Sequence, residues 1–186
     1  MLRKNPTGHY PQVAQSAFID PTAIICGHVI IEDNVFVGPY AVIRADEVDE
    51  NGQIEPIVIK ADSNIQDGVV IHSKAGAAIH VGARSSIAHR SIVHGPCSVG
   101  DDVFIGFNSV VFNTHIGNGC VIRHNSVVDS IDLSPNFHIP PMTNVSAGFD
   151  LSSIAKVPPH YSEFSESVVS ANNALVEGYK KIANEL

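Results

Sequence analysis

The stretch VGARSSIAHRSIVHGPCSVGDDVFIGFNSVV, residues 81–111, decides the fold of this chain because it places an aliphatic residue at every sixth position. These guide residues are Val81, Ile87, Val93, Val99, Ile105 and Val111. A six-residue period is typical of short strands wound into a β-solenoid, with one strand on each face of a prism. Three hexads make one coil, so residues about 18 apart are expected to stack at the inter-strand spacing of ~4.8 Å. The sequence therefore predicts an all-β solenoid.

The same period extends beyond this stretch in both directions. Further guide residues are expected at Phe18, Ile24, Ile30, Phe36, Val42, Ile59, Ile65 and Ile71, and after a one-residue slip at Ile116, Ile122 and Val128. The residue two before each guide should also point inward and be small, and the residue after it should point outward. Two segments interrupt the period and should bulge outward. Val42 and Ile59 are 17 residues apart, five more than two hexads, and Ile71 and Val81 are ten apart, four more than one hexad.

The C-terminal segment changes to a helical period. Pro158 and Pro159 end the hexads, and apolar residues then recur at a spacing of three to four. These are Phe164, Val168, Ala171, Leu175, Tyr179, Ile182 and Leu186. The pattern predicts an amphipathic helix that packs on the flank of a solenoid. We expect a solenoid domain over residues 1–157 and this helix over residues 158–186.

Composition excludes several classes of partner. A net charge of −8 argues against nucleic acid or an anionic membrane surface as a ligand. No apolar run is long enough to span a bilayer, and Met1–Tyr10 lacks the apolar core of a signal peptide. Cys26, Cys97 and Cys120 lack metal-site spacing and are expected to be free thiols of a reducing compartment. A cytoplasmic location is therefore expected, with a leader removed from a longer precursor as the open alternative.

Three histidines occupy informative positions in the register. His72 and His94 each follow a guide residue and are 22 apart, which is one coil plus the four-residue bulge. Both should point outward on one face, one coil apart, where two imidazoles can converge on one ion. His89 lies one face away in the same chain. In a trimer with closed cyclic symmetry, His89 of one subunit could complete the site of the next.

Acidic and basic residues are placed near the histidines by the same arithmetic. Asp67 should lie beneath His89 at a corner between faces, because Ile65 and Ile87 are also 22 apart. Val42 and Ile65 are 23 apart, one coil plus a bulge of five, so Arg44 should lie beneath Asp67 in the same corner column. Glu47 should immediately precede the column that holds Ile71 and Val93.

The spacing favours a metal site over solvated histidines. A lone outward histidine is usually solvated or hydrogen-bonded, and no role is assigned to the remaining ones, His9, His28, His80, His115, His124, His138 and His160. Two histidines in one outward column with a third nearby are a different case. Three neutral imidazoles suit Zn²⁺, and also Fe²⁺ or Co²⁺, with one coordination position left for water.

Several stretches resemble the γ-class carbonic anhydrases, including the archaeal prototype and the carboxysomal members. They are RADE (44–47), SNIQDGVVIH (63–72), AHRSIVHGP (88–96), VGDDVFIG (99–106) and EGYK (177–180), and the likeness covers nearly the whole chain. The resemblance implies a left-handed parallel β-helix, a homotrimer and three metals at subunit interfaces. It also implies reversible hydration of CO₂ to bicarbonate and a proton by a metal-bound hydroxide.

The resemblance assigns roles residue by residue. His72 and His94 of one subunit and His89 of the partner subunit would be the metal ligands. Glu47 and Gln66 would hydrogen-bond the metal-bound solvent, and Asn64 and Asn172 would line the CO₂ pocket. Arg44 and Asp67 would form an ion pair between subunits, with Asp46 in the same network. Asn172 also stands out by itself, because it is an amide on the packing face of the predicted helix.

One segment departs from the family pattern. Highly active members carry a longer acidic loop after the first histidine, with a glutamate as proton shuttle, whereas Ser73–Ala77 contains no carboxylate. Two alternatives stay open, of which the missing carboxylate supports the first and the shared solenoid the second. One is a metal-binding protein without turnover, acting as a scaffold or in assembly. The other is a hexapeptide acyltransferase, which shares the solenoid and typically uses one histidine as general base.

Overall fold

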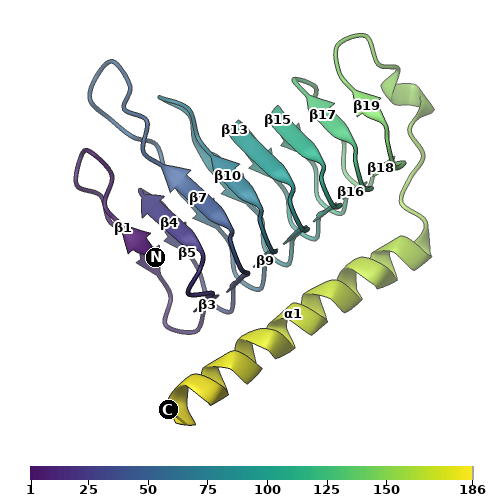
Figure 1. Cartoon of the computed structure of the whole chain (residues 1–186). Helices are drawn as coiled ribbons and strands as arrows, with labels where there is room; N and C mark the ends of the chain where they lie inside the picture. Colours follow the sequence, from purple (N-terminus) through teal and green to yellow (C-terminus); the bar gives the residue numbers. More distant parts are fainter. Residues whose placement is uncertain (186) are drawn as a thin grey trace.

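The computed structural model describes residues 1–185. It is a parallel β-solenoid of about seven turns with a single C-terminal helix, and it matches a left-handed β-helix of hexapeptide repeats (Figure 1). The predicted fold class is confirmed. Leu186, the last apolar position predicted for the helix, lies outside the described residues.

The strands form three faces, and every strand pairs with its neighbours in parallel. The first face holds β1 (Leu2–Arg3), β4 (Ile24–Gly27), β7 (Val42–Ala45), β10 (Val70–His72), β13 (Ile92–Val99), β15 (Val110–Ile116), β17 (Val127–Asp129) and β19 (Asn144–Val145). The second holds β2 (Gln12–Val13), β5 (Val29–Ile31), β8 (Ile57–Ile59) and β11 (Ile79–Val81), and continues into the later halves of β13 and β15. The third holds β3 (Phe18–Ile19), β6 (Phe36–Val37), β9 (Asn64–Ile65), β12 (Ser86–Ile87), β14 (Phe104–Ile105), β16 (Val121–Ile122) and β18 (His138–Ile139).

The interior is a stack of guide residues, and the predicted register holds from Ile59 onward. One column, for example, runs through Ile71, Val93, Val111 and Val128, all fully buried. The small inward positions carry serines whose hydroxyls donate to backbone carbonyls, as Ser85 does to Gly100 at 2.8 Å. Cys97 and Cys120 are buried free thiols, as predicted, and burial raises the pKa of both.

The register predicted N-terminal to Ile59 is wrong by one residue. The inward residues there are Ile19, Ile25, Ile31, Val37 and Ile43, each directly after a predicted guide. Because each predicted guide is followed by a second aliphatic residue, both frames place an apolar side chain inside. The small inward positions decide between them, since Ala23, Val29, Val35 and Ala41 are all fully buried. The strand pairing fixes the length of the first insertion. Ile43 is the partner of Ile71, 28 residues later, and one coil is 18 residues, so the insertion adds ten.

The helix α1 (Pro159–Glu185) runs back along the third face, from the end of the solenoid near β18 toward β3 (Figure 1). Its aromatic contacts include Phe164 on Phe104, with ring centroids 5.3 Å apart, and Tyr179 on Phe18 at 4.7 Å. Val176 is buried in this contact, whereas Leu175 stays 43% exposed. A short 3₁₀ helix, η1 (Leu151–Ser153), precedes α1. Within residues 1–185, no helix combines the length and the apolar character needed to cross a membrane.

Candidate metal-binding site in two halves

His72 and His94 lie side by side on the first face. They are direct partners in the pairing of β10 with β13, and their ring centroids are 5.1 Å apart in an edge-to-face arrangement. The predicted outward column is therefore confirmed. Nδ1 of His94 lies 3.1 Å from the carbonyl oxygen of Gly95, which leaves its Nε2 available to a ligand.

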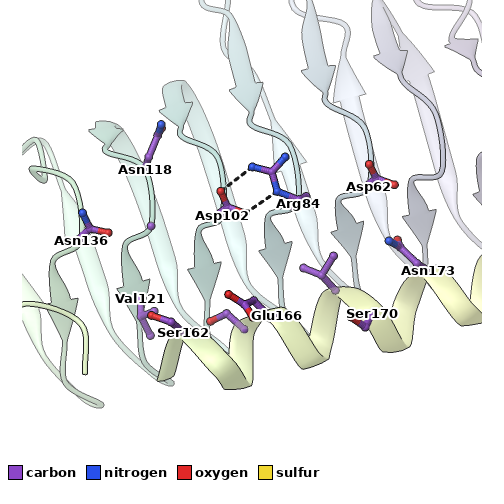
Figure 2. A pocket seen from close by; sticks show the side chains of 13 residues that line it. Asp62, Arg84, Asp102, Asn118, Val121, Asn136, Ser162, Glu166, Ser170 and Asn173 are labelled. Carbon is purple, nitrogen blue, oxygen red and sulfur yellow. Dashed lines mark hydrogen bonds and ion pairs between the residues drawn. The ribbon is translucent and has the colours of Figure 1, made fainter. Parts of the chain in front are cut away.

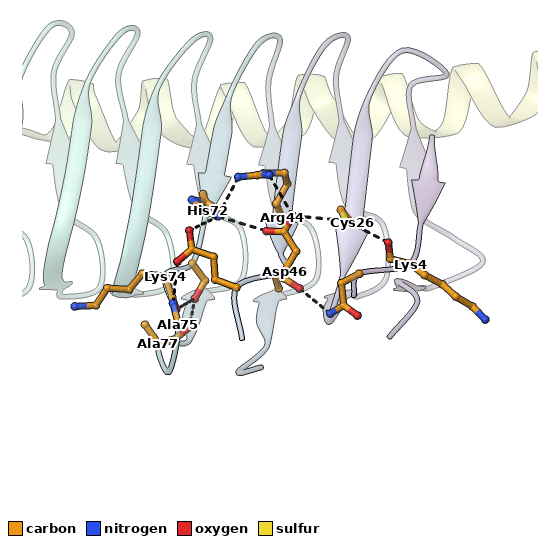
Figure 3. A network of polar contacts seen from close by, with 12 residues as sticks. Lys4, Cys26, Arg44, Asp46, His72, Lys74, Ala75 and Ala77 are labelled. Carbon is orange, nitrogen blue, oxygen red and sulfur yellow. Dashed lines mark hydrogen bonds and ion pairs between the residues drawn. The ribbon is translucent and has the colours of Figure 1, made fainter. Parts of the chain in front are cut away.

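Charged side chains surround Nε2 of His72 (Figure 3). Nη2 of Arg44 lies 3.1 Å away, and Oδ1 of Asp46 and Oε1 of Glu47 each lie 3.5 Å away. Burial and the neighbouring Arg44 guanidinium lower the pKa of His72. Because a guanidinium can only donate, the contact with Arg44 requires a neutral imidazole whose Nε2 accepts. This is the protonation state that a metal ligand needs.

The predicted placement of Arg44 beneath Asp67 is wrong. Arg44 is the direct strand partner of His72, and its guanidinium pairs with Asp46 at 3.1 Å. The reason is the size of the first insertion, which is ten residues and not five. Glu47 likewise does not precede the column of Ile71 by register. It lies at the start of the insertion that follows β7, and its side chain still reaches His72.

His89 lies at the corner that follows β12. Its Nδ1 is 3.6 Å from Oδ2 of Asp67, which confirms the predicted neighbour beneath it, and its ring contacts Phe107 at 5.3 Å. A cavity of about 430 Å³ opens here between the corner and α1. Its polar lining includes Gln66, Asp67, His89 and Asn172, and its apolar lining includes Phe36, Phe104, Phe107, Phe164, Val168 and Leu175.

A chain of hydrogen bonds orients Gln66 in this cavity. Its Nε2 donates to Oδ1 of Asn64 at 2.9 Å, and Nδ2 of Asn64 donates to the hydroxyl of Ser86 at 2.8 Å. Asn64 is fully buried and lies behind Gln66, outside the residues that line the cavity. Asn172 donates from Nδ2 to the carbonyl of Val168 at 2.9 Å, so its Oδ1 is left for the cavity. Ser86 was not singled out from the sequence, although it lies 22 residues after Asn64 and so one coil above it.

The site thus consists of two halves in one chain. We name His72, His94, Arg44, Asp46 and Glu47 the pair half. His89, Asp67, Gln66, Asn64 and Asn172 form the cavity half. Across residues 1–185, no three His, Cys, Asp or Glu side chains of one chain are grouped as a metal site. Each half also carries a buried polar atom without a hydrogen-bond partner, Oδ1 of Asp46 in the first and Nδ1 of His89 in the second.

A larger cavity, about 740 Å³, follows the other long edge of α1 (Figure 2). Its lining includes Asp62, Glu166 and a two-pronged ion pair in which Arg84 donates twice to Asp102 at 2.7 Å. None of the residues of either half lines it. His80 also lies away from the site, exposed on the second face.

Sequence comparisons find hexapeptide repeats and closely similar proteins. A profile described as bacterial transferase hexapeptide (six repeats) matches residues 10–45, and one described as hexapeptide repeat of succinyl-transferase matches residues 96–130. A carbonic anhydrase of Methanosarcina thermophila is 36% identical, over 95% of this chain and 78% of that protein. The carboxysome assembly protein CcmM of Nostoc sp. is 34% identical over 90% of this chain, which spans only 31% of that protein.

A structural comparison shows the same architecture. A hexapeptide transferase family protein from Anaplasma phagocytophilum superposes with a TM-score of 0.78, covering 96% of this chain and 98% of the other. At 22% identity, this likeness concerns the fold alone. The 36% identity to the archaeal enzyme extends over nearly the whole chain, and it is this relationship that shows that the chain belongs to the γ-class carbonic anhydrase family.

Proposed function

We propose that this protein is a carbonic anhydrase, which hydrates CO₂ reversibly to bicarbonate and a proton. The site would form at the interfaces of a homotrimer, where the pair half of one subunit meets the cavity half of the next. The observation that carries the proposal is the pair of His72 and His94 on adjacent strands, together with a third histidine, His89, at the edge of a cavity into which two amides project.

The donor chemistry of the two halves fits a divalent metal. His72, His94 and His89 of the partner subunit would hold Zn²⁺, or Fe²⁺ or Co²⁺, as neutral imidazoles. Nδ1 of His94 faces a carbonyl oxygen and Nδ1 of His89 faces a carboxylate, the contacts that orient metal-binding histidines in proteins. When bound, such a metal acts as a Lewis acid that makes water a nucleophile near neutral pH.

The cavity half would receive the substrate. CO₂ is small and apolar overall with polar oxygens, so it suits a cavity whose wall is aromatic apart from a few amides. Gln66, held by Asn64, presents the rest of its amide group at a fixed angle, and Asn172 presents a carbonyl oxygen. Because these groups are oriented before substrate arrives, little conformational entropy is lost on binding.

The pair half would handle the proton. Glu47 is the carboxylate that lies beside His72 and is also half exposed to solvent, so it can pass a proton between the site and bulk water. Arg44 and Asp46 pair with each other beside His72. We assign to Arg44, Asp46 and Asp67 the ion pairs that join subunits.

A second candidate is a metal-bearing protein without turnover. The turn at Ser73–Ala77 brings a backbone amide to the site and no carboxylate, which favours slow proton transfer. A relative named as a carboxysome assembly protein also matches 90% of the chain. The acyltransferase alternative has the shared fold as its support, with profiles named for transferases over two segments.

Metal analysis coupled with stopped-flow CO₂ hydration tests the proposal. Full-length protein supplied anaerobically with Zn²⁺ or Fe²⁺ should hold about one metal per chain and hydrate CO₂, and His94→Ala should lose both properties. Metal-replete protein without hydration would support the second candidate. Metal content near zero after supply would contradict the site itself.

A further inference from the structure

We propose that the backbone N–H of Ala75 is a positioning group of this site, because it holds the carboxylate of Glu47 beside His72. The inference deepens the proposed function and rests on it for its consequence in turnover. The contact itself is independent of that function. It gives a role to the Ser73–Ala77 turn, which contributes no side-chain acid.

The two oxygens of the Glu47 carboxylate face different groups, and one of them accepts a hydrogen bond from Ala75. Oε1 lies 3.5 Å from Nε2 of His72, and Oε2 accepts a hydrogen bond from the N–H of Ala75 at 3.2 Å. The side chain of Glu47 is 48% exposed. A long, half-exposed side chain samples several rotamers unless a second contact fixes it. The amide of Ala75 supplies that second contact, and it can donate to a carboxylate but cannot neutralise it.

The turn that carries this amide is itself fixed. The N–H of Ala77 donates to the carbonyl of Lys74 at 3.1 Å, and Gly76 has φ +70°. These features describe a type II turn with Ala75 at its first central position, where the N–H takes no part in the turn's own hydrogen bond. The turn is anchored at its base, because Ser73 donates from its N–H to the carbonyl of Arg44 at 3.3 Å and from its hydroxyl to the carbonyl of Ala77.

The two insertions of the solenoid therefore meet over the pair half (Figure 3). Glu47 belongs to the first insertion and Ala75 to the second. Asp46 already has a partner in Arg44, at 3.1 Å, so it does not compete for the amide. In the described chain, Ala75 N–H is the backbone donor that Glu47 uses.

Ala75→Pro removes this donor and suits the turn. Proline is common at the first central position of a type II turn, so the backbone should keep its path while the N–H is lost. Glu50→Pro is the matched control. Glu50 takes the corresponding position in the turn over residues 49–52 of the first insertion, which is closed by the N–H of Gly52 donating to Asp49 at 3.1 Å. Its own N–H has no partner within the part of the chain described by the structure.

The first test is a double-mutant cycle on the zinc-loaded, full-length protein. Ala75→Pro should lower kcat for CO₂ hydration about three- to tenfold at unchanged metal content, the size expected from the loss of one ordinary hydrogen bond at a half-exposed position. The same change in a Glu47→Gln background should have little further effect, and Glu50→Pro should behave as wild type. An unchanged kcat in Ala75→Pro, or an equal loss in both backgrounds, would overturn the proposal.

The second test does not need turnover. In the amide NMR spectrum of the metal-free protein, the Ala75 proton should lie downfield, as expected for a donor to a carboxylate, and should move upfield in Glu47→Gln. If wild-type protein binds metal but hydrates no CO₂, this shift still decides whether the contact exists. An Ala75 amide that does not respond to the substitution would overturn the proposal, whatever the activity.

Discussion

The pair half lies on an open face of the solenoid, whereas the cavity half lies at the edge of the helix. Glu47 and Arg44 of the pair half are 48% and 38% exposed at their side chains. Asn64 and Gln66 of the cavity half are 0% and 5% exposed, whereas Asp67 and His89 at its rim are 54% and 43% exposed at their side chains. The two parts of the candidate site therefore differ in how deeply their polar side chains are buried.

The two halves also satisfy their polar groups differently. In the pair half, charges face one another across adjacent strands and an insertion, and solvent screens them. In the interior of the cavity half, the neutral amides of Gln66 and Asn64 are linked in series to Ser86. The column of side chains beneath α1 is otherwise mostly apolar or aromatic, as at Phe18, Phe36, Phe104 and Val121. Asn64 and Ser86 are polar residues in this column, next to the cavity. Because they are buried, their polar groups need hydrogen-bond partners within the protein.

Complementation between subunits tests whether the pair half of one subunit meets the cavity half of another, and it has the largest expected effect. His89→Ala and His94→Ala proteins should each lose nearly all bound metal. After unfolding and refolding of an equal mixture, about a quarter of the sites should be restored, because each restored site needs its pair from one variant and its His89 from the other. Metal content per chain is the measurement. A mixture of His72→Ala and His94→Ala, both altered in the pair half, should restore none. Absence of rescue in the first mixture would show that the two halves do not meet between subunits.

The second prediction is that substitutions in the two halves change the free energy of unfolding by different amounts. Asn64→Ala removes the central amide of a buried network and leaves Gln66 and Ser86 without partners, so the free energy of unfolding should fall by about 2–4 kcal/mol. Glu47→Gln, at an exposed position, should change it by less than about 0.5 kcal/mol. Denaturant titration of both variants gives the comparison. Equal effects would mean that the cavity half is no more dependent on its hydrogen bonds than the pair half.

Turnover should expose the proton path of the pair half. Glu47 is the acid placed beside His72 with access to water, and the turn at Ser73–Ala77 adds none. Maximal turnover should therefore be limited by proton transfer and rise severalfold with an imidazole-type buffer, while kcat/KM for CO₂ changes little. Stopped-flow rates at several buffer concentrations provide the measurement. Fast turnover that ignores buffer would require a relay outside the pair half.

Acidification should weaken the packing of the start of α1 on the solenoid, and it has the smallest expected effect. His138 stacks on Tyr161 near the start of α1, with ring centroids 4.7 Å apart, and burial, Arg123 and His160 lower its pKa. The unfolded chain, with a histidine pKa of about 6.5, binds the proton first. The free energy of unfolding should therefore fall as the pH drops below about 6.5, toward the lower folded-state pKa. His138→Phe keeps the ring stacking and should reduce this dependence between pH 7.5 and 5.5. An unchanged dependence in the variant would assign it to other groups.

The positions of the three histidines could be predicted from the sequence, because a hexapeptide period converts chain distance into position. The placement of His72 beside His94 and of Asp67 beneath His89 follows from counting. Arg44 shows where counting fails. Adjacent aliphatic residues, such as Val42 and Ile43, fit two frames equally well. The predicted interval to Ile59 is two hexads plus five residues, whereas the structure has one hexad plus ten, and this difference changes the partner of Arg44.

The sequence by itself determined the solenoid, the outward histidine column and the helical tail, because each is a local repeat whose period specifies which side chains are buried. Only the tertiary structure decided which face α1 covers, that Asn64 serves Gln66 instead of lining the cavity, and that two insertions meet at Glu47 and Ala75. The first and the last of these depend on α1 and on the insertions, whose positions cannot be counted from the hexapeptide period. They depend on where irregular backbone returns to the solenoid, and that path is set by packing and hydrogen bonding in three dimensions.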